Sequence, residues 1–141
     1  MQDKDEFEYL IGQKYTDVSD LGFFSFNGRT SQYGPDMPET SCTTISNGDK
    51  VIVLWEFVKQ GRIMEGKIYE IQDILVLDKS YTSCVNCFIS RKEGIRIKSF
   101  HSSEKMTREN AILAIELDEN TRKIRIVKIK GLEWKTPYFN N

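Results

Sequence analysis

The chain has 141 residues, of which 39% are hydrophobic and 29% charged, and its formal net charge is −1. This composition excludes a mainly disordered chain, and the length suits a single domain, residues 1–141, with one hydrophobic core. No apolar run approaches the ~18 residues that a membrane-spanning helix needs, so we expect no membrane span. The near-zero net charge counts against nucleic acid as a partner. The acidic start, without an apolar signal region, favours a cytoplasmic protein, and an exported protein whose signal was removed is the alternative.

The first forty-nine residues predict one helix and one strand before a long irregular segment. Phe7, Leu10 and Ile11 have helical spacing, so residues 3–12 are expected to form a short amphipathic helix that docks on the rest of the chain. Residues 23–26 read as a strand with Phe24 and Phe26 on one face. Residues 27–49 are rich in Gly, Pro, Ser and Thr and read as a loop, with a short edge strand at residues 43–45 as the alternative.

Residues 50–58 carry the strongest structural signal in the chain. Five apolar residues in succession, Val51 to Trp55, predict a central strand that is covered on both faces. Glu56 follows this run directly. If Glu56 faces the interior, its pKa is raised and it becomes a candidate acid or ligand contact. Because Lys59 and Gln60 follow, we expect instead that Glu56 begins the solvated end of the strand.

The second half of the chain reads as short strands joined by turns. Strand signals occupy residues 67–71, 74–77 and 95–100, while residues 78–94 form a second irregular region with an extended part at 85–89. The last hairpin pairs residues 112–117 with 123–130, and the latter change phase near Ile126 and Val127, which predicts a β-bulge there. The fold class is therefore mainly β: an antiparallel barrel or sandwich of about seven strands with a short N-terminal helix.

Three cysteines and one histidine are the residues with the clearest chemical potential. Cys84 and Cys87 have the spacing of a zinc knuckle, and Cys42 with His101 would complete four ligands. Only one such pair is present, so we expect no cofactor and unlinked thiols, with zinc or a disulfide as alternatives. No phosphate-binding loop and no positioned nucleophile–base set is visible, which argues against an enzyme.

These observations favour a non-enzymatic module that binds another protein, of which an immunity or inhibitor protein is one form. Its partner would meet the two long irregular segments. The alternative is a β-barrel that holds a small apolar ligand in its mouth, and the second alternative is a metal-site protein. The candidate ligand- or partner-binding residues, drawn from loops and strand ends, are Tyr33, Asp36, Met37, Tyr81, Trp55, Glu56 and Tyr69.

Overall fold

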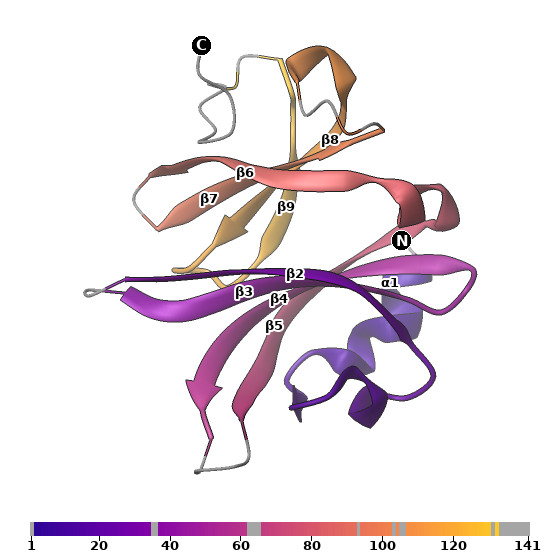
Figure 1. Cartoon of the computed structure of the whole chain (residues 1–141), viewed down its shortest axis with the longest axis vertical. Helices are drawn as coiled ribbons and strands as arrows, with labels where there is room; N and C mark the ends of the chain where they lie inside the picture. Colours follow the sequence, from indigo (N-terminus) through magenta and orange to yellow (C-terminus); the bar gives the residue numbers. More distant parts are fainter. Residues whose placement is uncertain are drawn as a thin grey trace. The chain divides into compact units, whose positions relative to one another are not determined.

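Two antiparallel sheets, one in each half of the chain, make up the computed structural model (Figure 1). The structure describes residues 2–34, 37–61, 66–92, 94–102, 104, 107–130 and 132. The chain divides into two compact units, Met1–Thr82 and Ser83–Asn141. The first unit contains the helix α1 (Gln2–Phe7), the 3-10 turns η1 (Glu8–Leu10) and η2 (Val18–Leu21), and the strands β1 (Lys14–Tyr15), β2 (Ser25–Gly34), β3 (Met37–Ser46), β4 (Lys50–Gln60) and β5 (Lys67–Asp78).

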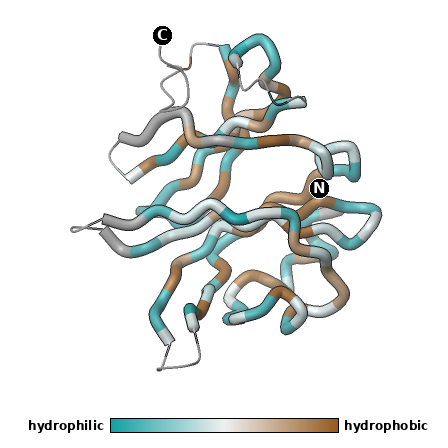
Figure 2. The backbone as a smooth tube through the Cα atoms, in the orientation of Figure 1, coloured by the Kyte–Doolittle hydropathy of each residue, from teal (hydrophilic) through white to brown (hydrophobic). Residues whose placement is uncertain are grey.

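The sheet of the first unit has the order β1-β5-β4-β3-β2, and every neighbouring pair is antiparallel. The apolar run at 51–55 lies in β4, the middle strand, as its composition predicted. Ile52 and Leu54 belong to one core cluster with Phe7 and Leu10 of the N-terminal helical segment. The predicted docking of this segment is thus confirmed, although α1 ends at Phe7 and the last turn is 3-10. Figure 2 shows the hydrophobic stretches of this unit.

One extra residue interrupts the pairing in β2 and another in β5. Opposite β3, Phe26 faces Ile45 and Gly28 faces Thr44, so Asn27 is the additional residue. A β-bulge of this kind shifts the alternation of side chains by one position. Phe26 and Arg29, three residues apart, therefore project from the same face of the sheet. Gln72 makes the corresponding bulge in β5, which is one continuous strand where the sequence suggested an interruption.

The prediction of a loop over residues 27–49 is wrong for the described residues, because β2 and β3 occupy most of this segment. Ser and Thr are common in loops, but threonine is β-branched and suits a pleated strand when neighbouring strands pair with it. Gly28 lies directly after the bulge, a usual place for a strand glycine. Phe24 packs against the core cluster, whereas Phe26 is 53% exposed, so these two rings do not share one environment as expected.

The second unit contains the turns η3 (Lys79–Ser83, shared with the first unit) and η4 (Arg108–Asn110) and the strands β6 (Val85–Lys92), β7 (Ile95–His101), β8 (Ala111–Asp118) and β9 (Ile124–Val127). These strands pair in chain order as an antiparallel meander. In the irregular region predicted at 78–94, η3 and β6 take up most of the residues, and the extended part expected at 85–89 lies within β6. The predicted bulge near Ile126 is absent from the described pairing, because β9 ends at Val127 without a register shift and Ile126 is 61% exposed.

Neither sheet closes on itself in the described part of the chain, so the predicted barrel is not formed. The mainly antiparallel β prediction is confirmed, whereas the single-domain boundary, 1–141, stays a prediction. Among the described residues, no helix is long and apolar enough to cross a bilayer.

Candidate functional site

Glu56 is the centre of a buried polar network in the first unit. Its side chain is fully buried, which contradicts the expectation that it begins a solvated strand end. The physical reason is that β4 continues to Gln60, and that Glu56 shares with Leu54 the face that the core covers. Cross-strand pairing sets Glu56 opposite Ser41 of β3 and Ile71 of β5.

Three hydroxyl groups donate hydrogen bonds to the Glu56 carboxylate. Ser41 Oγ lies 2.7 Å and Thr43 Oγ1 2.5 Å from Oε1, and Tyr15 Oη donates to Oε2. Burial raises the pKa of Glu56, and the hydroxyl groups and the Arg29 guanidinium oppose this rise. Burial and the charge of Glu56 also raise the pKa of Tyr15.

Arg29 binds Glu56 through two of these hydroxyl groups rather than directly. Its Nε donates to Thr43 Oγ1 over 2.8 Å, and its Nη2 donates to Tyr15 Oη over 3.0 Å. Each hydroxyl therefore accepts from the guanidinium and donates to the carboxylate. The result is a hydroxyl-bridged Arg–Glu pair. Thr43 links Nε of Arg29 to Oε1 of Glu56, and Tyr15 links Nη2 to Oε2.

Aromatic rings fix the plane of the Arg29 guanidinium. Its Cζ lies 3.7 Å from the ring centroid of Tyr69 and 5.3 Å from that of Phe26. Tyr69 in turn stacks on Tyr15, with centroids 5.4 Å apart. Cation–π contacts of this kind favour one orientation of a side chain that would otherwise lose much rotamer entropy. Arg29 is thus held in place by hydrogen bonds at its edge and by rings at its face.

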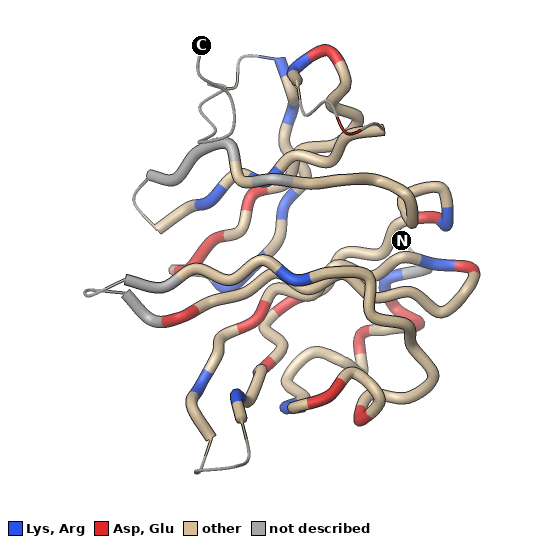
Figure 3. The backbone as a smooth tube through the Cα atoms, viewed as in Figure 1, with Lys and Arg blue, Asp and Glu red and all other residues tan. Residues whose placement is uncertain are grey.

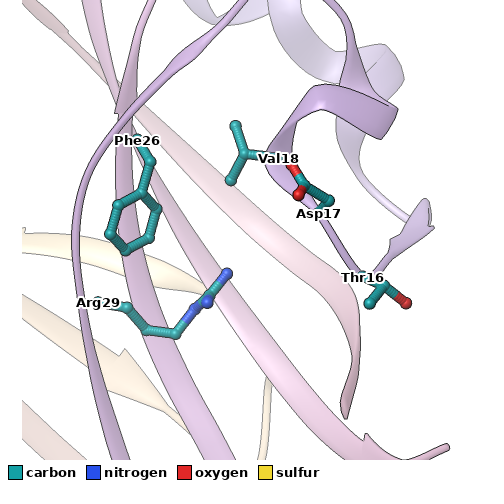
Figure 4. Close-up of a pocket in the computed structure, with 5 residues that line it drawn as sticks. All are labelled: Thr16, Asp17, Val18, Phe26 and Arg29. Atoms are coloured by element: carbon teal, nitrogen blue, oxygen red, sulfur yellow. The ribbon is translucent and has the colours of Figure 1, made fainter. Parts of the chain in front are cut away.

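Arg29 also lines an open pocket of about 240 Å³, which we call the Arg29 pocket. Phe26 and Arg29 form the wall on β2, and the segment Thr16–Val18, which leads from β1 into η2, faces them (Figure 4). Asp17 caps η2, and its Oδ1 accepts hydrogen bonds from the amide and hydroxyl groups of Ser19, both at 2.9 Å. These hydrogen bonds lower the pKa of Asp17. The pocket therefore has a cationic wall, an anionic wall and two apolar side chains, Phe26 and Val18.

The residues proposed from sequence lie in several different environments. Trp55 is fully buried and packs edge-on against Phe57, with ring centroids 6.2 Å apart, and Tyr81 is half-buried in η3. Glu56 and Tyr69 belong to the network behind Arg29. Asp36 and the side chains of Tyr33 and Met37 lie outside the described residues.

The proposed metal ligands also lie apart in the fold. Cys42 is buried in β3, Cys84 is partly buried between η3 and β6, and the Cys87 side chain lies outside the description. Among the described side chains, no group of three or more His, Cys, Asp and Glu could hold a metal ion.

His101 lies in a strand, not in the loop in which it was expected. It is fully buried near the end of the second unit's sheet, and its Nε2 is 2.7 Å from Ser99 Oγ, two residues earlier on β7. Burial lowers its pKa. A serine–histidine contact has the composition of a nucleophile and base, but both side chains are fully buried, so a substrate cannot reach them.

Sequence reasoning missed Arg29, Asp17 and the hydroxyl groups of Ser41 and Thr43. Period-two alternation through Ser41, Thr43 and Ile45 was the available signal for a buried polar face. Arg29 gave no such signal, because its position depends on the bulge at Asn27. In comparisons with known proteins, no family model, curated protein or solved structure matches this chain.

Proposed function

We propose that the chain is a non-enzymatic module that binds another protein through the Arg29 pocket and the exposed rings beside it in sequence. The observation that carries this proposal is the pairing of a fixed guanidinium with two exposed aromatic side chains. Phe23 is completely exposed and Phe26 is 53% exposed. Aromatic residues and arginine are the types that contribute most to protein–protein binding energy.

The volume of the pocket supports a protein side chain as the occupant. At about 240 Å³ it is smaller than the ~300–1,000 Å³ of typical small-molecule sites. Its walls also carry Arg29 and Asp17, which do not suit the small apolar ligand of the alternative hypothesis. An immunity or inhibitor protein, which neutralises its partner by covering it, is one form of the proposed module.

The burial of Glu56 argues against a catalytic role for the same network. A general acid must come within hydrogen-bond reach of the substrate. Glu56 has no exposed surface and Tyr15 only 3%, and Arg29 reaches them from the pocket side. The network is therefore better suited to holding Arg29 than to transferring a proton to a ligand.

A capture experiment with matched variants tests the proposal. The full chain is immobilised and compared with a variant that carries Phe23→Ser and Phe26→Ser, and with Ile112→Ser, which removes an exposed apolar side chain of the second unit. We expect one protein that binds the unaltered chain and the Ile112→Ser control with the same Kd. The double variant should bind it at least tenfold more weakly, because burying each ring contributes about 1.5–3 kcal/mol.

Two outcomes would contradict the proposal. One is a partner whose Kd is the same for the double variant and for the unaltered chain. The other is the recovery of no specific partner from extracts of the native host.

A further inference from the structure

We infer that the partner contributes an extended acidic segment, which adds as a strand to the edge of β2 and inserts a carboxylate into the Arg29 pocket. This inference rests on the proposed function and specifies the chemistry of the partner. Three features support it: the character of the β2 edge, the unused donors of Arg29 and the placement of Asp17.

Strand β2 is an edge strand, and the stretch between its two register shifts, residues 28–32, contains no bulge, lysine or proline. In the described sheet it pairs with β3 alone. Natural edge strands are commonly blocked by lysine, proline, β-bulges or inward-pointing charges, and β2 has the bulge at Asn27 before this stretch and Arg29 within it. Residues 25–34 include neither lysine nor proline, and Arg29 is their only charged residue. Figure 3 shows β2 as a largely uncharged segment.

The pairing with β3 stays in regular register from Gly28 to Gln32, between two register shifts. A partner segment of about five residues could pair along this stretch, in which strand addition supplies main-chain hydrogen bonds and pockets read alternate side chains. Arg29 lies inside this stretch and points into the pocket.

The Arg29 guanidinium retains donors for a ligand. Among the described residues, its hydrogen bonds use Nε and Nη2 and none uses Nη1, and Arg29 lines the pocket. Carboxylates are the protein groups that match a guanidinium best. The two hydroxyl bridges and the Tyr69 ring already fix the guanidinium, so less entropy is lost when the ligand binds.

Asp17 restricts where the partner's acidic group can bind. Its carboxylate forms the opposite wall, so a second acidic side chain beside the first would be repelled. A backbone N–H of an added strand could instead donate to Asp17. The favoured segment therefore has one acidic residue between uncharged, strand-forming neighbours.

Selection from a phage-displayed library of random 12-residue peptides, with the full chain as target, tests the inference. We expect the enriched peptides to share one Glu or Asp at a fixed position among β-branched or aromatic residues. For the best synthetic peptide, replacing the acid by its amide should weaken binding about tenfold or more, the value of a hydrogen bond to a charged group. Arg29→Gln should weaken it similarly, whereas Arg125→Gln, at a 73% exposed arginine of the second unit, should not.

Backbone pairing is tested separately with the same peptide. Two versions of the peptide are made, one N-methylated at the odd-numbered amides and one at the even-numbered amides. Binding should be abolished in the version whose methyl groups face β2 and kept in the other. Hydrogen exchange of residues 28–32 should slow when the unmodified peptide binds. Enriched peptides without a shared acid, equal binding to the Arg29→Gln variant, or unchanged exchange in β2 would each overturn the inference.

The two proposals fail separately in these experiments. If binding of the captured partner depends on Phe23 and Phe26 but not on Arg29, the proposal of a protein-binding module stands and the inference of an acidic segment is refuted. Concentration-dependent self-association through β2, measured by sedimentation of the chain alone, would identify a second copy as the occupant and would also overturn the acidic-partner inference.

Discussion

Glu56→Gln should change the pH dependence of stability in a direction that the buried network determines. The raised pKa means that the folded chain binds a proton at Glu56 more tightly than the unfolded chain does. The stability from this group is complete below its usual pKa of 4.5 and is lost as the pH rises through the folded-state pKa. Glutamine resembles the protonated acid in shape and charge, and it cannot titrate.

The magnitude follows from the hydrogen bonds around the carboxyl group. Glutamine presents an amide N–H₂ to hydroxyl groups that now donate to Glu56, so we expect a loss of about 1–3 kcal/mol for the variant at pH 4.5 and below. Above pH 4.5 the unaltered chain should lose up to about 1.4 kcal/mol of this advantage for each pH unit until the folded-state pKa is reached. The advantage should then remain constant.

Urea unfolding followed by circular dichroism at several pH values between 4 and 8.5 measures this difference. Glu8→Gln, at an exposed glutamate, is the control and should show no comparable trend. The reasoning is refuted if the advantage of the unaltered chain over Glu56→Gln grows with pH. That result would mean that the three hydroxyl donors and Arg29 stabilise the carboxylate more than burial destabilises it.

Three further changes test the surface and the bulge. Phe23→Ser should change the free energy of unfolding by no more than about 0.5 kcal/mol, because the ring is completely exposed, so thermal unfolding should be nearly unchanged although partner binding weakens about tenfold. Asp17→Asn keeps a residue that can cap η2 and removes the negative wall, so the selected acidic peptide should bind several-fold more tightly by calorimetry, and weaker binding would refute the repulsion. Deleting Asn27 removes the bulge and turns Phe26 to the opposite face from Arg29, so peptide binding should be lost; unchanged binding would show that the pocket does not need both walls.

The central strand could be predicted from sequence because its apolar residues occur in succession. A strand that is apolar on both faces is expected inside a sheet, and β4 pairs with β3 on one edge and β5 on the other, while Ile52 and Leu54 pack into the core cluster. Glu56 was placed wrongly because Lys59 and Gln60 were given more weight than the period-two relation that aligns it with Ile52 and Leu54. The sequence alone did not show where the strand leaves the core.

The candidate site was less predictable because it depends on insertions into strands. Strict alternation would put Phe26 and Arg29 on opposite faces, and only the pairing with β3 shows that Asn27 changes this. The partners of Arg29 come from strands distant in sequence: Tyr15 from β1, Thr43 from β3 and Tyr69 from β5. No local pattern in the sequence reports such a convergence.

The hydroxyl-bridged pair has a consequence for how a complex could come apart. When a ligand leaves the Arg29 pocket, the guanidinium keeps its hydrogen bonds to Thr43 and Tyr15, which connect it to Glu56. Departure of the ligand therefore leaves the Nε and Nη2 donors of Arg29 hydrogen-bonded within the chain. Such an anchor can be occupied and vacated repeatedly while the chain that carries it stays folded, which is the behaviour of a temporary association between proteins that also exist apart.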